Sequence, residues 1–323
     1  MARLQKLLKF IERTKPGIEV APYFNPALPK RDGNNVLILD VLDTDRLHEL
    51  ARDDDMVPDA RIDEIEEVDI VGDASRIGEV VAATGRSGDF AYVISSHNFE
   101  HLPNPILFLQ GVYDVLAPGG VLSMAVPDNR ACFDHFRFPS RLSDWLEAYH
   151  EDRSQPSPET VFDAWTNTAF YYRDDGTPQP GCHFLLERPD RYRAERRLDL
   201  AFAEYQRLKA EGGAYRDSHC SVFFPETLEL MLRDLRALGL IKLDIIEITQ
   251  PFGHEFFVHL RKGDGGPLAM DEAFYDRRQE LLRRIADNLG GAPYRRGGVR
   301  RRVFTALNDL LVRVKNAGGR SRR

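Results

Sequence analysis

The chain has 323 residues, of which 42% are hydrophobic and 29% charged, and its formal net charge is -7. A chain of this length and composition buries a substantial core, which excludes disorder throughout, and its negative charge argues against nucleic acid as a general partner. Three cysteines, at 132, 182 and 220, do not suggest a disulfide framework, and no apolar run approaches the roughly 20 residues that span a bilayer. These features predict a cytoplasmic protein.

The first predicted element is an N-terminal helix over residues 1–14. Its apolar residues recur at helical spacing, at Leu4, Leu7, Leu8 and Ile11. Lys and Glu interrupt the run and no small-residue cleavage site follows it, so it does not resemble a targeting signal.

Short β-branched runs then alternate with helical patterns up to about residue 130, which is typical of βα units and a parallel sheet. The predicted strands are 18–21, 35–41, 68–71, 90–95 and 120–126. The predicted helices are 44–52, 75–83 and 105–116; Asp43 or Thr44 caps the first, and Pro118-Gly119-Gly120 ends the last.

From about residue 127 to 224 the alternation stops, and the sequence is rich in Arg, Asp, Pro and aromatic residues. Helices are expected near 141–149 and 199–211 but no clear strand, so we interpret about 129–224 as a large helical insertion or lid. A helix from Pro225 to Gly239 and two strands, 242–248 and 255–261, complete a domain over 15–264. The prediction is an α/β, Rossmann-like, mostly parallel sheet whose last strand is antiparallel, followed by a helical, basic C-terminal extension over 265–323.

Acidic residues follow three successive predicted strands, where a sheet of this kind binds ligands. Glu19 near the end of the first strand can take a charged amino group, and Asp40, at the end of the second, can accept two hydrogen bonds from ribose hydroxyls. Asp73, beside Ala74 at the end of the third, can receive an adenine amino group. Alone, each acid could equally be a solvated loop residue; together they indicate a nucleotide-cofactor site.

The loop after the first strand departs from the usual E-x-G-x-G-x-G pattern. Ala21, Tyr23 and Asn25 stand where glycines are expected, so the loop alone does not distinguish a cofactor site from a plain turn. A G-x-G-x-x-G pattern is also missing, which disfavours a nicotinamide-dependent oxidoreductase.

The region around the fourth strand has a more specific pattern. It keeps Asp89-Phe90, Ser96 and Glu100-His101-Leu102, followed by a helix that ends in Leu116-Ala117-Pro118-Gly119-Gly120. This pattern resembles the type 11 class of S-adenosylmethionine-dependent methyltransferases. Gly17 to Pro22, Pro127 to Arg130 and Cys132 to Arg137 resemble a bacterial subfamily often associated with glycan or polysaccharide biosynthesis, in which Ala21 is usually glycine.

The resemblance covers roughly residues 15 to 262 and implies a class I fold with S-adenosylmethionine as cofactor. Glu19, Asp40 and Asp73 would hold its methionine, ribose and adenine parts. The other residues expected to line the cofactor are Ala21, Ala74, Ser96 and His97.

Methyl transfer to a hydroxyl requires a positioned acceptor and a group that removes its proton. The candidates are His97 after the fourth strand, His135 after the fifth, and His219 before the last helix, although a lone histidine is more often structural. His135 is favoured because Arg130, Asp134 and Arg137 form a dense polar cluster around it in sequence. These three residues are expected to bind the acceptor, and the two arginines would suit a phosphate or carboxylate on it.

A metal site is not predicted. Cys132, Cys182 and Cys220 each stand near a histidine, but their spacing matches no familiar zinc pattern. His101 is expected to cap or pack the start of its helix.

The tail from residue 290 to 323 carries a net charge of +9, which leaves -16 on the remainder. Over 301–315, apolar residues share one helical face beneath a basic flank. Two alternatives remain open for this helix: peripheral contact with the inner, anionic membrane surface, or docking on its own domain or on a second subunit of a homodimer.

The function predicted from sequence is methyl transfer to an oxygen, or less favourably a nitrogen, of a small polar, sugar-containing acceptor. The alternative is a cofactor-binding or scaffolding protein of the same fold without turnover.

Overall fold

The computed structural model describes residues 2–55, 57–179, 191–194, 197–211, 215–266 and 268–290. The chain divides into two compact units, Met1–Met270 and Asp271–Arg323. In the second unit the described part contains helix α10, Glu272–Gly290. Within the described residues, no helix combines the length and apolar character that crossing a bilayer requires. The predicted helix over 301–315 and the pair Cys182 and His183 lie outside the described residues.

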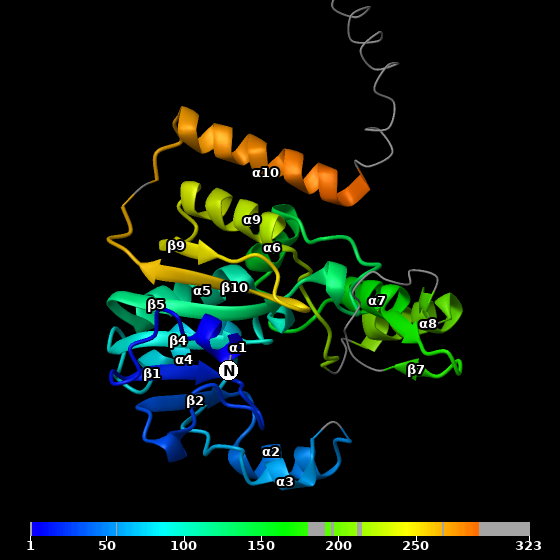
Figure 1. The fold of residues 1–323 in the computed structure, drawn as a ribbon, viewed down its shortest axis with the longest axis horizontal. Helices are drawn as coiled ribbons and strands as arrows, with labels where there is room; N and C mark the ends of the chain where they lie inside the picture. The colour runs from blue at the N-terminus through cyan, green and yellow to red at the C-terminus, as the bar shows by residue number, and fades with distance from the viewer. Residues whose placement is uncertain are drawn as a thin grey trace, which may run out of the picture. The chain divides into compact units, whose positions relative to one another are not determined.

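The first unit is built on a seven-stranded sheet with the order β3-β2-β1-β4-β5-β10-β9 (Figure 1). Strands β3, β2, β1, β4 and β5 pair in parallel, whereas β10 runs antiparallel to both β5 and β9. This arrangement confirms the predicted Rossmann-like fold, including the antiparallel last strand. The strand bounds are β1 Gly17–Val20, β2 Val36–Asp40, β3 Ile70–Val71, β4 Phe90–Ser96, β5 Leu116–Pro127, β9 Leu243–Ile248 and β10 Glu255–Lys262.

Several helices begin where the sequence places a cap. Helix α2, Thr44–Arg52, has Asp43 as its N-cap, and the Asp43 side chain accepts a hydrogen bond from the backbone N–H of Arg46. Helices α5, Pro105–Val115, and α9, Pro225–Ala237, both have proline at their start. The remaining short elements before the insertion are α1 Ala2–Leu7, η1 Lys30–Asp32, α3 Asp59–Ile62, η2 Ala74–Arg76, α4 Ile77–Ala82, η3 Phe99–His101 and η4 Asn129–Ala131.

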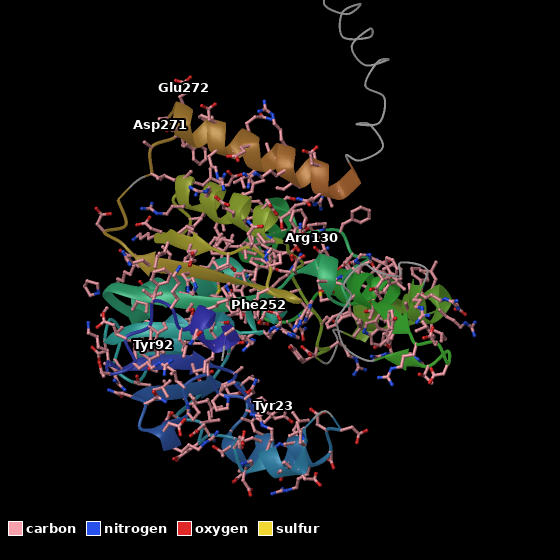
Figure 2. All side chains as sticks on the ribbon, viewed as in Figure 1. Tyr23, Tyr92, Arg130, Phe252, Asp271 and Glu272 are labelled. Carbon is pink, nitrogen blue, oxygen red and sulfur yellow. The ribbon has the colours of Figure 1, made fainter. Side chains whose placement is uncertain are left out.

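The two faces of the sheet are covered by different elements. Because side chains alternate along a strand, Ile18 and Val20 of β1 pack in the cluster that contains α4, α5 and α9. On the other face, Leu7 from helix α1 packs with Ile38 and with Tyr92, which Figure 2 labels. Helix α1 is shorter than the predicted 1–14, yet it covers the sheet face to which Glu19 belongs.

The insertion contains strands that the sequence analysis does not predict. Its helices are α6 Leu142–His150, α7 Pro158–Asn167 and α8 Leu198–Glu211. Strands β6 Ala169–Tyr172, β7 Pro178–Gln179 and β8 Tyr192–Ala194 form a separate three-stranded antiparallel sheet. The expectation that 129–224 contains no clear strand is therefore wrong, because strands of two to four residues are too short to show an alternation of apolar and polar residues.

Candidate functional site

The carboxyl ends of the first four strands meet at one edge of the sheet. The backbone N–H of Ala21 donates to the carbonyl of Leu39, and that of Gly72 donates to the carbonyl of Asp40. Strand β1 pairs with β2 on one side and with β4 on the other, so the strand order changes direction between β1 and β4. A parallel sheet opens a ligand crevice at such a reversal, so the predicted acids stand at the expected edge.

Asp40 and Asp73 both close their strands. Asp40 is 5% exposed, and its Oδ1 accepts the backbone N–H of Leu42 at 3.1 Å. Burial raises the pKa of Asp40 above its usual value, although backbone hydrogen bonds from Leu42 and Val41 oppose the rise. Asp73 is half-buried and caps η2 by accepting the N–H of Ser75, with Ala74 half-buried beside it. Both carboxylates thus lie where the ribose and adenine contacts are predicted.

The Glu19 carboxylate is buried and accepts hydrogen bonds from the backbone of its own chain. It is 1% exposed, and its two carboxylate oxygens accept the backbone N–H groups of Ala27 at 2.6 Å and Leu28 at 3.1 Å. Burial raises its pKa to about 7, even though these two hydrogen bonds favour the ionised form. These bonds account for the buried carboxylate without a cofactor, so its predicted contact with the methionine amino group is not supported by the structure.

The raised pKa of Glu19 predicts a specific pH dependence of the free energy of unfolding. In the unfolded chain the carboxyl ionises near 4.5, whereas in the folded chain it does so near 7, so between these pH values the folded state binds the extra proton. The free energy of unfolding should therefore fall as pH rises through this window, by about 3 kcal/mol in total for this group. Urea unfolding of the wild type and of Glu19→Gln at several pH values measures the effect. The variant should lack this component, and equal slopes would contradict the assignment.

The loop after β1 keeps a left-handed backbone at two positions where the family pattern has glycine. Ala21 has φ 47° and Tyr23 has φ 50°. The ring of Tyr23 packs with Phe24 beside α2 and α3, and its hydroxyl lies 3.5 Å from Asp54 (Figure 2). A side chain in this region is strained, so the loop has a backbone conformation that glycine adopts more easily than Ala21 or Tyr23.

Ala21→Gly is expected to stabilise the protein by roughly 0.5–1 kcal/mol. Glycine removes the strain of the left-handed backbone in the folded state, and this gain exceeds the loss that comes from the greater backbone freedom of glycine in the unfolded chain. Thermal unfolding of the purified variant measures this change. The matched control is Ala27→Gly in the same loop, which lacks a positive φ and should lose stability instead. A loss in both variants would contradict the strain argument.

Ser96 and His97, at the end of β4, contact the N-terminal helix and β10. Arg3 of α1 donates to the Ser96 hydroxyl at 2.9 Å and to both carboxylate oxygens of Glu255. His97 Nε2 lies 2.8 Å from Glu255. Burial lowers the pKa of His97, but the carboxylates of Glu100 and Glu255 outweigh it and raise the pKa to about 9. A histidine protonated at neutral pH cannot accept a proton from an acceptor, which argues against His97 as the predicted base.

A second polar cluster lies next to His97. The Glu100 carboxylate is fully buried, with its Oε1 3.5 Å from His97 Nδ1 and 4.0 Å from His219 Nε2. His219 Nδ1 lies 2.6 Å from Asp134, whose other oxygen accepts from Arg137 at 2.8 Å. Burial raises the pKa of Asp134, but His219 and Arg137 outweigh it and hold the pKa at about 2. The cluster thus joins the end of β4 to the insertion.

His135 does not belong to this cluster. Its Nδ1 lies 3.1 Å from the carbonyl oxygen of Arg130, and its ring lies against Phe136 and Tyr192. Asp134, which stands next to His135 in sequence, contacts His219 instead. His219 is therefore the better-placed of the two predicted bases.

The predicted acceptor-binding arginines are largely occupied. Arg137 is 5% exposed and donates to Asp134, Asp163 and the carbonyl of His219. Arg130 pairs with Asp128 at 2.6 Å and lies over the ring of Phe224. These contacts are structural, so the geometry supports neither the prediction that the arginines bind an anionic group of the acceptor nor the prediction that Asp134 contacts the acceptor.

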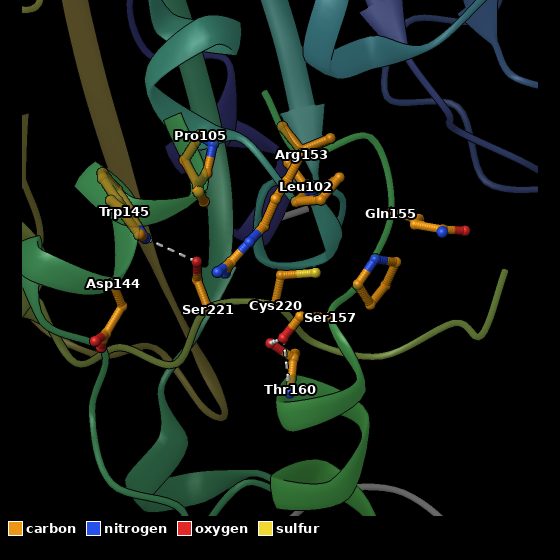
Figure 3. A pocket seen from close by; sticks show the side chains of 13 residues that line it. Leu102, Pro105, Asp144, Trp145, Arg153, Gln155, Ser157, Thr160, Cys220 and Ser221 are labelled. Carbon is orange, nitrogen blue, oxygen red and sulfur yellow. Dashed lines mark hydrogen bonds between the residues drawn. The ribbon is translucent and has the colours of Figure 1, made fainter. Parts of the chain in front are cut away.

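Two pockets flank the segment from Asp217 to Ser221. A pocket of about 180 Å³ is lined by His101, Asp217, Ser218 and His219 on one side and by aromatic residues of the insertion on the other: Phe133, Trp165 and Phe170. A smaller pocket of about 50 Å³ contains Cys220 and Ser221, and there the indole of Trp145 donates to Ser221 (Figure 3). The larger pocket has the mixture of aromatic and polar groups that suits a small polar molecule.

Sequence reasoning missed Glu100, Asp217, Glu255 and Arg3 as site residues. Glu100 appears in the sequence only as part of the family pattern, and Arg3 only as part of an amphipathic helix. A weak signal for Asp217 was present in the sequence, because it stands two positions before the candidate base His219. In the structure the Asp217 carboxylate lies 2.8 Å from His101 Nδ1.

Comparison with known proteins gives neither a family-model match nor a match to a curated protein. Among solved structures, an S-adenosylmethionine-dependent methyltransferase from Mesorhizobium loti is 11% identical over 81% of this chain and 98% of its own, with a TM-score of 0.39. A methyltransferase of the same cofactor from Aquifex aeolicus is 12% identical over 80% and 88% of the two chains, with a TM-score of 0.38. A candidate zinc-dependent alcohol dehydrogenase from Rhodobacter sphaeroides is 11% identical over 80% and 88%, with a TM-score of 0.41. Identities and TM-scores this low carry no argument about family or activity.

Proposed function

We propose that this chain transfers a methyl group from S-adenosylmethionine to a hydroxyl oxygen of a small polar, sugar-containing acceptor. The proposal is carried by one observation: Asp40 and Asp73 close adjacent parallel strands beside the strand-order reversal of a sheet completed by an antiparallel β10. The resemblance of the β4 to β5 region to type 11 methyltransferases, and to their glycan-associated subfamily, supports the same cofactor and acceptor class.

The cofactor would lie along the edge formed by the ends of β1 to β4. The Asp40 carboxylate would accept the ribose hydroxyls, and Asp73 would receive the adenine amino group. The left-handed backbone at Ala21 lets the chain turn sharply after β1, as a glycine loop does. Glu19 would then act indirectly, because its carboxylate fixes the far end of the loop through Ala27 and Leu28.

The acceptor would occupy the pocket beside His101 and His219. Asp134 holds Nδ1 of His219, which leaves Nε2 as the nitrogen that can face an acceptor. In an in-line displacement the acceptor oxygen bonds to the methyl carbon while the carbon–sulfur bond breaks and its electron pair goes to sulfur. The hydroxyl proton would go to His219, directly or through a group that His219 holds.

Titration calorimetry with S-adenosylmethionine, S-adenosylhomocysteine and NAD⁺ tests the proposal. We expect the two sulfur cofactors to bind and NAD⁺ not to bind. Binding of NAD⁺ alone would favour an oxidoreductase, and binding of none of the three would favour a scaffolding protein of this fold.

A further inference from the structure

The Glu100 carboxylate is buried without a hydrogen bond. Its exposed fraction is 0%, and among the described residues neither of its oxygens has a hydrogen-bond partner. The nearest basic atoms are His97 Nδ1 at 3.5 Å and His219 Nε2 at 4.0 Å. His97 compensates the charge of Glu100 only in part, because burying an ionised carboxylate is costly unless hydrogen bonds also satisfy its oxygens, so the carboxylate keeps the capacity to bind a further donor or a cation.

Two histidines share that space. One ligand atom from each of Glu100, His101 and His219 lies within 4.8 Å of the other two. In a tetrahedral site with bonds near 2.1 Å, ligand atoms lie about 3.4 Å apart, so side-chain shifts of about 1 Å would close the set around an ion.

Both imidazoles are already oriented by carboxylates. His101 Nδ1 lies 2.8 Å from Asp217, and His219 Nδ1 lies 2.6 Å from Asp134. Metal-binding histidines usually donate one ring N–H to such a carboxylate, which fixes the tautomer and leaves the second nitrogen as ligand. Arg137 in turn fixes Asp134, so the arrangement supplies ligands together with their supporting groups.

From this geometry we propose that Glu100, His101 and His219 bind one divalent transition-metal ion of the zinc class. Two imidazoles and one carboxylate suit such ions and leave a coordination position open. His101 and His219 also line the 180 Å³ pocket, so the open position can face an acceptor. The sequence predicts no metal because its Cys-His pairs match no zinc spacing, and these ligands do not include a cysteine.

The second group of possible ligands is a poorer site. His97, His254 and Glu255 also lie close together. Both oxygens of Glu255, however, accept hydrogen bonds from the guanidinium of Arg3, at 2.7 and 2.9 Å. A fixed cation on the only carboxylate of the group opposes binding of a second cation.

The ion would change how the acceptor is activated. A hydroxyl bound at the open position would have a lower pKa and would release its proton to water, and His219 would then bind the ion instead of accepting the proton. This role rests on the proposed methyl transfer, whereas binding of the ion does not.

The test is a titration of the chelator-treated full-length protein with Co²⁺, followed by its visible absorption bands. We expect bands that saturate at one Co²⁺ per chain and that Zn²⁺ abolishes. Glu100→Gln keeps the side-chain shape, and we expect it to bind Co²⁺ at least 100-fold more weakly. His254→Gln, from the competing group, should bind like the wild type.

Thermal unfolding in the presence of chelator checks that Glu100→Gln is folded. Because this variant removes one of the two carboxylates that pair with His97, its metal-free form should melt lower than the metal-free wild type but still unfold in a single cooperative transition. Absence of Co²⁺ bands, or equal affinity in Glu100→Gln, would overturn the metal site. Calorimetry of the chelated protein with S-adenosylhomocysteine is independent of this result, so failure of the ion and failure of the proposed cofactor can be told apart.

Discussion

Replacing Asp40 by alanine is expected to weaken binding of S-adenosylhomocysteine by more than about 100-fold. The Asp40 carboxylate closes β2 and is the group predicted to accept both ribose hydroxyls. Hydrogen bonds to a charged acceptor contribute about 1.5–3 kcal/mol each, and every 1.4 kcal/mol is about tenfold in affinity. Titration calorimetry at neutral pH measures the loss.

Asp40→Asn removes the negative charge of the side chain while preserving the local fold. The asparagine oxygen can still accept the N–H of Leu42, which Asp40 accepts at 3.1 Å, so the end of β2 should be preserved. Its NH₂ group cannot accept a ribose hydroxyl, and an affinity loss of about 10-fold or more is expected. The control is Asp45→Asn, an exposed acid in the first turn of α2 that should leave affinity unchanged. Normal binding by Asp40→Ala would remove the ribose assignment.

The sheet could be predicted because its strands carry their own signal. Val36–Asp40 is a run of four apolar residues that ends in an acid, and it is buried on both faces of the sheet. Helix α2 matches its predicted bounds because the Asp43 cap is encoded next to it in sequence. Local patterns of this kind fix an element without reference to the rest of the chain.

The small sheet of the insertion could not be predicted in this way. Strand β6 is four residues long and only Ala169 in it is fully buried, so apolar and polar residues do not alternate clearly. Its partner β8 pairs Tyr192 with Tyr171, about twenty positions away. The stability of such a pair comes from cross-strand contacts, which a local pattern does not contain.

The polar cluster shows the same limit at the level of single residues. In the sequence, Asp134 belongs to the polar segment of His135 and is predicted to bind the acceptor, but in the structure it contacts His219, which lies 85 positions away. Glu100 was noted only as part of a motif, and its burial beside His219 depends on how the last part of the insertion packs against the segment after β4. Residue types at a site can be inferred from sequence, whereas their pairing is decided by tertiary packing.

Arg137→Met is expected to lower the free energy of unfolding by about 3–5 kcal/mol, because it leaves the charge of Asp134 buried without one of its two basic partners. The side chains of Arg137 and Asp134 are 3% and 2% exposed. The change also removes the donor to the carbonyl of His219, which Arg137 contacts at 3.0 Å. Urea unfolding near pH 7 measures the loss.

A surface pair with the same spacing provides the control. Arg141 and Asp144 are also three residues apart, but their side chains are 78% and 40% exposed, so Arg141→Met should change the free energy of unfolding far less than Arg137→Met does. Adding Asp134→Asn to Arg137→Met removes the unpaired charge. The free energy of unfolding lost in the double variant should therefore be smaller than the sum of the two single losses, by roughly 1–3 kcal/mol. Simple additivity would mean that Arg137 stabilises the insertion through Asp163 and the His219 carbonyl, and that Asp134 does not need it to remain ionised.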